Sequence, residues 1–319
     1  MWALAALLVL LPFGAFEWVA RAHGFRPALT DTPDLWAYQR MQLRPHDARA
    51  VVVFGSSKAQ LGINLDEFER ACGTRPIQLA IDGTSAHAFL EELARDEAFT
   101  GLALVETGFL FDNNERHERR AQEYAASYSS FRGSVARRFD FRLHWFIGQA
   151  LAIVSPDLSA RRITEAFSAG HWPRPSYLRM SPDRGRFGDY QMVDSALLQR
   201  LTVNEFTTGG ITLNEEQLAA RLARVEAAVT RIQARGGRVV IIRMPPAVAA
   251  RDDSDAARWE AVKAHTSALC LSAADDPVLA SFKCPDGNHL DYRDAARFTR
   301  ALVAVLRTRL AERGDTRLQ

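Results

Sequence analysis

Three side chains that together can activate a nucleophile stand at opposite ends of the 319-residue chain. Ser57 closes the sequence Gly55-Ser56-Ser57, and more than two hundred residues later Asp286 and His289 share one short Asp-Gly-Asn-His turn. A serine hydroxyl is a weak nucleophile until a base takes its proton during attack. An imidazole at His289 can be that base, and a carboxylate at Asp286 can hold the imidazole in the required tautomer. The pattern predicts that Ser57, Asp286 and His289 form a catalytic triad.

The rest of the chain alternates between strand and helix patterns. Continuous apolar runs predict buried strands at 50–54, 76–81, 102–106, 238–244 and 278–282. Amphipathic patterns predict helices at 86–95, 213–235, 256–269 and 293–310. Such alternation is typical of crossover units and a parallel sheet. We expect a flavodoxin-like, three-layer α/β/α fold with a parallel sheet of about five strands.

The candidate residues all follow predicted strands. Ser57 comes just after the first strand, Gly83 after the second, Thr107 after the third, and Asp286 and His289 after the last. Ligands of open parallel sheets bind beyond the carboxyl ends of the strands. We therefore expect these residues to meet at one edge of the sheet.

Acyl transfer at such a site also needs hydrogen-bond donors for the developing oxyanion. The backbone amides of Ser57 and Gly83 are the candidates that their positions suggest. The alternative for Gly83 is an ordinary loop glycine.

These blocks resemble the SGNH, or GDSL-like, hydrolases. That family has a Gly-x-Ser block after the first strand, a Gly after the second, an Asn after the third and an Asp-x-x-His block before the last helix. Residues 55–57, Gly83 and residues 286–289 match three of the four blocks. The family register favours Ser57 over Ser56 as the nucleophile.

The third block departs from the family. Where the family has its Asn, this chain has Glu106-Thr107-Gly108. The resemblance implies an oxyanion donor at this place, so Thr107 is expected to substitute for the Asn, with Asn113 as the alternative.

The resemblance is strongest to a membrane-anchored branch whose Gly-Ser-Ser block is followed by Gly-Ile-Asn, as Gly62-Ile63-Asn64 is here. It implies modification of bacterial envelope polymers, such as O-acetylation of a polysaccharide. The implied partners are a glycan or acyl-ester substrate and a membrane-bound O-acyltransferase.

The first 22 residues are almost continuously apolar, with Glu17 as the one interruption before Arg21. About 20 such residues can cross a bilayer as a helix. We expect an inner-membrane, single-pass anchor that places the catalytic domain in the periplasm. A cleaved signal peptide ending at Ala20-Arg21-Ala22 and a buried N-terminal helix are the alternatives. Residues 23–48 then form a linker, and 49–319 the SGNH-like domain.

Residues 109–210 do not fit the alternation and are expected to be an inserted, mostly helical region. They hold half of the 30 aromatic residues. These rings are expected to form the small core of the insertion; stacking on sugar rings is the alternative.

The three cysteines admit two interpretations. A disulfide between Cys270 and Cys284 would be worth about 3 kcal/mol in the chain-entropy model and would steady the Asp-His loop. Two buried thiols are the alternative, and Cys72 is expected to be a core thiol.

The charge pattern argues against a nucleic-acid partner, because the net charge is +2 and the arginines are interleaved with acids. The histidines show no metal-ligand spacing, and no cofactor is expected. The sequence thus predicts a serine-dependent acyl hydrolase or acyltransferase, with O-acetyl ester chemistry. Its rivals are a non-catalytic glycan-binding protein of the same fold and a lipid-directed esterase that would use residues 143–154 as its lipid contact.

Overall fold

The computed structural model describes residues 2–107, 115–209, 213–245 and 253–319. Five parallel strands form its main sheet, in the order β2-β1-β3-β6-β7. The strands are β1 (Val51–Phe54), β2 (Ile77–Gln78), β3 (Leu102–Glu106), β6 (Arg238–Arg243) and β7 (Leu269–Ser272). This is the strand order of flavodoxin-like sheets, in which the direction of winding reverses between β1 and β3. The predicted α/β class and five-stranded parallel sheet are confirmed.

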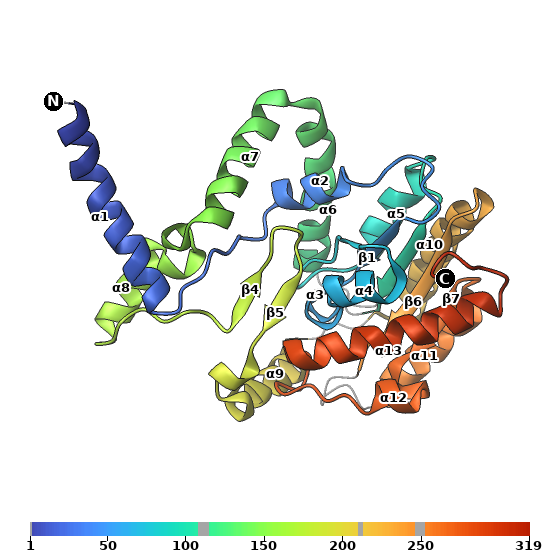
Figure 1. The fold of residues 1–319 in the computed structure, drawn as a ribbon. Helices are drawn as coiled ribbons and strands as arrows, with labels where there is room; N and C mark the ends of the chain where they lie inside the picture. The colour runs from blue at the N-terminus through green and yellow to red at the C-terminus, as the bar shows by residue number, and fades with distance from the viewer. Residues whose placement is uncertain (1, 108–114, 210–212, 246–252) are drawn as a thin grey trace.

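Helices cover both faces of the sheet because both faces of its strands are apolar (Figure 1). Val52 and Phe54 project to one face, and Val51 and Val53 to the other. The first face packs against α2 (Pro33–Arg40), α5 (His87–Arg95), α6 (Glu115–Gly133), α10 (Glu215–Ala234) and α11 (Asp253–His265). The second packs against α3 (Ser57–Gly62), α4 (Leu65–Cys72), α12 (Pro277–Ala280) and α13 (Tyr292–Ala311).

The region between β3 and α10 carries additional elements. They are α7 (Val135–Ala150), α8 (Ala160–Ser168), α9 (Ser195–Gly209), the 3-10 helices η1 (Ala152–Val154), η2 (Pro156–Leu158) and η3 (Tyr190–Met192), and the antiparallel pair β4 (Leu178–Met180) and β5 (Arg186–Gly188). Several aromatic rings here pack on one another or on α2. Phe141 lies 5.1 Å from Tyr38 and 5.5 Å from Phe131 between ring centroids. These contacts favour the interpretation that the rings form a local core.

The expected strand at 278–282 is wrong. Residues 277–280 form α12 instead, with Pro277 at the first helical position and the Asp276 side chain accepting hydrogen bonds from the amides of Val278 and Leu279. The cap outweighs the apolar run, because Asp and Pro together are a strong helix start. The fifth strand is β7, in a stretch that the sequence pattern placed at the end of a helix.

Residues 23–48, expected as a linker, include a helix that belongs to the core. Trp36 of α2 is fully buried, and its indole Nε1 donates a hydrogen bond of 2.9 Å to the carbonyl of Leu79 beside β2. A buried tryptophan satisfied in this way fixes α2 against the sheet.

The N-terminal helix α1 (Trp2–Ala22) extends away from the body of the molecule (Figure 1). Its carboxyl-terminal end is held by Glu17, whose carboxylate accepts the amides of Ala152 and Ile153, each at 3.0 Å. Across the described residues, none of the helices combines the length and apolar character that a membrane crossing requires. The membrane helix predicted from the sequence is therefore unsupported.

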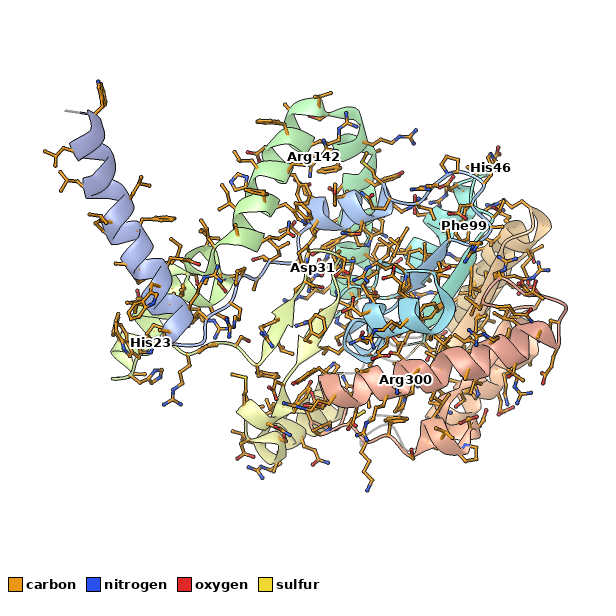
Figure 2. All side chains as sticks on the ribbon, viewed as in Figure 1. His23, Asp31, His46, Phe99, Arg142 and Arg300 are labelled. Atoms are coloured by element: carbon orange, nitrogen blue, oxygen red, sulfur yellow. The ribbon has the colours of Figure 1, made fainter. Side chains whose placement is uncertain are left out.

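A buried arginine ties three parts of the chain together. The Arg184 side chain is inaccessible to solvent, and its guanidinium pairs with both oxygens of Asp31, at 2.9 and 2.8 Å. It also donates to the carbonyls of Gln78 and Ala80. Figure 2 shows Asp31 at the centre of the molecule, between the inserted region and the sheet. Arg184 adopts a positive φ of 66°, a cost that these four hydrogen bonds offset.

We expect Arg184→Ala to lower the free energy of unfolding by about 3–5 kcal/mol, because it removes the ion-pair partner of the largely buried Asp31 and leaves that carboxylate with only the neutral Gln60 amide as a donor. Urea denaturation of the full chain measures this. Arg174→Ala, at an exposed position on the inserted region, is the matched control and should change stability by less than about 0.5 kcal/mol. Equal stability of the two variants would contradict the assignment.

Candidate active site

Ser57 lies at the amino terminus of α3, directly after β1. Gly55 makes this turn possible: its φ is +146°, and a Cβ there would lie 2.6 Å from the Cβ of Glu106. Ser57 is the first helical residue, so its backbone amide has no acceptor within the helix. The side chain is 6% exposed. The local sequence therefore presents a nearly buried hydroxyl beside a free helix amide.

The three predicted catalytic residues are adjacent in space. The Ser57 hydroxyl lies 2.8 Å from His289 Nε2, and His289 Nδ1 lies 2.7 Å from Asp286 Oδ2. Both contacts are satisfied when the imidazole carries its proton on Nδ1, so that Nε2 accepts from the serine. This is the hydrogen-bond order of a Ser-His-Asp triad. Segments separated by 232 residues thus meet at the carboxyl edge of the sheet.

Asp286 holds the loop that carries His289. Its Oδ1 accepts the backbone amides of Asn288 and His289, at 2.9 and 2.7 Å. Burial on its own would raise the pKa of Asp286, but the hydrogen bond and charge of the His289 ring, together with these amides, bring that pKa below its usual value. The carboxylate is therefore ionised at neutral pH and suited to stabilise a protonated imidazole.

Ser56, the lesser candidate nucleophile, is engaged elsewhere. Its hydroxyl and its amide both donate to Glu106 Oε2, at 2.8 and 2.9 Å, and both residues are buried. Glu106 lies at the end of β3, and its carboxylate anchors the turn before Ser57. The sequence analysis missed this role, although a carboxylate closing an otherwise apolar buried strand was the available signal.

Tyr190 is a second residue that the sequence analysis missed. It belongs to the inserted region, and its buried hydroxyl donates to Asp286 Oδ2 at 3.0 Å, the oxygen that also accepts from His289. Its backbone amide donates to Asp291 at 3.1 Å. Burial and the charge of Asp286 raise the pKa of Tyr190 well above its usual value, so it stays a donor in alkaline solution. No motif in the sequence marks this tyrosine.

The oxyanion donors are partly accounted for. Gly83 has a φ of +61°, and a Cβ there would lie 3.9 Å from the His117 ring. The amide of Thr107 donates to the carbonyl of Ile242 at 3.1 Å, so only its side chain is free for another partner. Asn113 falls outside the described residues. The amide of Ser57 is the donor that the geometry favours, because the helix start leaves it without an acceptor.

A third carboxylate lies near the triad. Asp82 pairs with Arg186 of β5 at 2.9 Å. Burial alone would raise the pKa of Asp82, whereas Arg186 and then His289 lower it. The charge of His289 therefore acts on Asp82, whose ion-pair partner Arg186 belongs to the inserted region.

A second serine-histidine pair lies nearby but differs in kind. Ser85 Oγ is 2.6 Å from His87 Nδ1, and Arg221 also approaches that nitrogen, at 3.1 Å. Both Ser85 and His87 are almost completely buried. Burial, followed by the charge of Arg221, lowers the pKa of His87 to about 4. With an arginine on the nitrogen that a base would use, this pair is a structural cluster.

All three cysteines are free thiols, which favours the second of the two interpretations: Cys270 and Cys284 form no disulfide. The two side chains face opposite sides of the sheet: Cys270 packs with the core beneath α10 and α11, and Cys284 with the core beneath α13. Burial raises the pKa of Cys270 to about 11 and that of Cys284 to about 12. Cys72 is buried, as expected. Within the described ranges, no group of three or more His, Cys, Asp or Glu side chains is placed to hold a metal ion.

Comparison with known proteins identifies no family. No protein-family model matches the chain, and no curated protein matches it. Among solved structures, it is similar to the crystal structure of a proposed acylhydrolase from Bacteroides fragilis, with 12% sequence identity and a TM-score of 0.42 over 88% of this chain and 100% of the other. A likeness at that level carries no argument about the site or its chemistry.

The Tyr190 hydroxyl should contribute measurably to stability, because it donates to a buried carboxylate. We expect Tyr190→Phe to lower the free energy of unfolding by about 1.5–3 kcal/mol at neutral pH. Urea denaturation measures the change. Tyr292→Phe is the control, since its hydroxyl makes no hydrogen bond with any residue that the structure describes. A difference of less than about 0.5 kcal/mol between the two variants would count against the contact.

The buried His87 should make stability fall in mild acid. Its pKa is about 4 when folded against a usual 6.5, so between these values the unfolded chain takes up a proton that the folded chain refuses. Stability is thus retained above pH 6.5 and lost, on the order of a few kcal/mol, as the pH falls toward 4. His87→Asn should flatten this dependence in urea titrations, while His144→Asn, at an exposed histidine, should leave it unchanged.

Proposed function

We propose that this protein is a serine-dependent acyl hydrolase or acyltransferase whose nucleophile is Ser57. The observation that carries the proposal is the continuous chain of contacts from the Ser57 hydroxyl through both nitrogens of His289 to Asp286, at 2.8 and 2.7 Å. Resemblance of the sequence blocks to SGNH hydrolases adds to this support, as does the location at the switch point of a flavodoxin-like sheet.

The geometry suits a two-step reaction. Ser57 Oγ attacks the ester carbonyl as its proton passes to His289 Nε2, and the negative oxygen forms beside the amide of Ser57. When the tetrahedral intermediate collapses, His289 gives the proton to the departing alcohol and leaves an acyl group on Ser57. His289 then deprotonates an incoming hydroxyl, which attacks the acyl carbonyl and restores the serine. Asp286 remains ionised throughout and stabilises the imidazolium.

The molecule that accepts the acyl group from Ser57 decides between the two activities. If water accepts it, the protein is an esterase; if a sugar hydroxyl accepts it, the protein is a transferase. The sequence resemblance favours O-acetyl ester chemistry on an envelope glycan, with a membrane-bound O-acyltransferase as a partner; these remain parts of the proposal. The proposed catalytic activity does not depend on the N-terminal helix, because every triad residue belongs to the sheet-bearing part of the chain.

The first test is turnover of 4-nitrophenyl acetate by the full chain. We expect Ser57→Ala and His289→Asn each to lower kcat by at least about 10³-fold, since the nucleophile and base act as one unit. Trapped wild-type protein should carry an acetyl group on the Ser57 peptide in mass spectrometry. Ser85→Ala is the control, because it removes the hydroxyl of the other serine-histidine pair and should retain activity within about threefold.

Two results would contradict the proposal. One is Ser57→Ala protein that turns over ester as fast as wild type while Ser85→Ala does not. The other is a folded wild-type protein that forms no acyl adduct yet retains glycan in a pull-down, which would indicate a non-catalytic binding protein.

A further inference from the structure

A charged cavity of about 330 Å³ lies between the inserted region and the loop after β2. Four of its lining side chains are arginines, from α6, α8, β4 and β5: Arg120, Arg162, Arg179 and Arg186. Asp82 lines the same cavity. Because elements far apart in the sequence contribute these cations, the tertiary structure alone gathers them.

The carboxylates in the wall form an ion pair with only one of these four arginines, Arg186. Asp31 is taken up by the buried Arg184, which lies behind the wall, and Asp82 by Arg186. Asp157 accepts the amide of Ser176 at 2.8 Å and forms no ion pair with an arginine of the wall.

Arg120, Arg162 and Arg179 make no ion pair with any carboxylate in the described part of the chain. Asp157 is the one carboxylate of the wall that is not paired with an arginine. Set against this single negative charge, the three unpaired arginines leave the cavity with a surplus of positive charge. Such a surplus in a concave, partly desolvated site attracts an anion.

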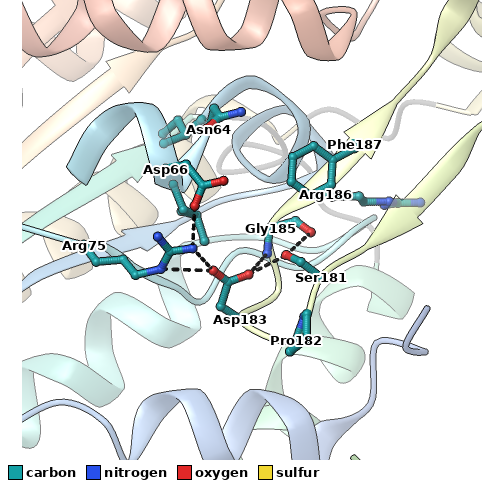
Figure 3. Close-up of a pocket in the computed structure, with 11 residues that line it drawn as sticks. Asn64, Asp66, Arg75, Ser181, Pro182, Asp183, Gly185, Arg186 and Phe187 are labelled. Atoms are coloured by element: carbon teal, nitrogen blue, oxygen red, sulfur yellow. Dashed lines mark hydrogen bonds and ion pairs between the residues drawn. The ribbon is translucent and has the colours of Figure 1, made fainter. Parts of the chain in front are cut away.

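A neighbouring cavity shows the opposite arrangement. It measures about 300 Å³ and lies between α4 and the β4–β5 pair (Figure 3). Its Arg75 is paired with three carboxylates, Asp66, Glu69 and Asp183, so this arginine leaves no surplus of positive charge. The first cavity is therefore not simply typical of an arginine-rich protein.

The charged cavity is linked to the reaction centre through Asp82. That carboxylate lines the cavity, pairs with Arg186, and is close enough to His289 for the imidazole to lower its pKa. Tyr177 lies between Ser176 and Leu178 of the cavity wall, and its ring centroid is 5.5 Å from that of Tyr190. The Tyr190 hydroxyl donates to Asp286 at 3.0 Å, so a chain of contacts joins the cavity wall to the triad.

We propose that this cavity binds an anionic substituent, a carboxylate or a phosphate, carried by the substrate whose ester Ser57 attacks. The inference rests on the proposed function for its link to catalysis, but not for binding itself. Guanidinium groups match both anions with paired hydrogen bonds, and several of them converge here. The substrate class is then an anionic acylated glycan rather than a neutral one.

Binding is tested on the full chain carrying Ser57→Ala, so that no turnover is needed. Calorimetry compares methyl glucuronoside, glucose 6-phosphate and neutral methyl glucoside. We expect one or both anionic sugars to bind at least about tenfold more tightly than the neutral one, and raised salt to weaken them. The two anionic probes distinguish a uronate from a phosphate ligand.

Variants locate the site. Arg162→Gln combined with Arg179→Gln should weaken anionic binding on the order of tenfold and leave neutral binding unchanged. Arg161→Gln, next to Arg162 on α8 but largely exposed and paired with Glu165, is the matched control and should bind as the parent does. Circular dichroism establishes that each variant is folded.

Equal affinity for anionic and neutral sugars would overturn the inference, as would equal losses in the Arg161 control and the double variant. If wild type lacks esterase activity while the anionic preference and its loss in the double variant hold, the proposed function fails and the binding site stands. If the wild type is active as an esterase but shows no preference for anionic sugars, the proposed function stands and the anion-binding site fails. The two claims are therefore separable.

Discussion

The carboxylate of Asp286 is the contact on which the site depends. It is buried and accepts four hydrogen bonds: the amides of Asn288 and His289, the ring of His289 and the hydroxyl of Tyr190. These four donors fix three parts of the structure: the two amides fix the backbone of the loop, the ring fixes the orientation of the imidazole, and Tyr190 fixes the inserted region. An ionised group so deeply placed is stable only when it is this fully satisfied. If the loop moved, the buried Asp286 carboxylate would lose its hydrogen-bond donors and remain charged in an apolar environment.

The inserted region is consequently part of the active site and not an appendage. Through Tyr190 it contacts Asp286 of the proposed triad, through Arg186 it neutralises Asp82, and through Arg184 it is bound to Asp31 and the end of β2. Arg184 and Arg186 are separated by a single residue and serve different partners, the first buried and the second at the rim. Rigid attachment at several points is what allows an insertion to position groups beside a nucleophile.

Glu106 shows how the turn before Ser57 is held. The family pattern led to an expected donor near this position, and the structure instead places a carboxylate behind the turn, accepting from Ser56. The hydroxyl of Ser56 is thereby occupied, which leaves the hydroxyl of Ser57 as the one in contact with His289. Two adjacent serines of the same type thus have separate positions because their surroundings differ.

The sequence by itself determined the parallel sheet and the position of Ser57 directly after β1, since apolar runs of strand length are local features. It placed Asp286 and His289 after a strand at 278–282 that is helix α12, so their contact with Ser57 was decided by the tertiary structure. It did not determine α12, where a local cap overrode an apolar run, nor the cysteines, whose facing depends on which side of β7 each packs. Only the tertiary structure decided that Tyr190 contacts Asp286 and that distant arginines share one cavity. Tyr190 and Asp286 are 96 residues apart, and the cavity arginines are spread between 120 and 186; no periodic pattern encodes the fold of the irregular chain between them.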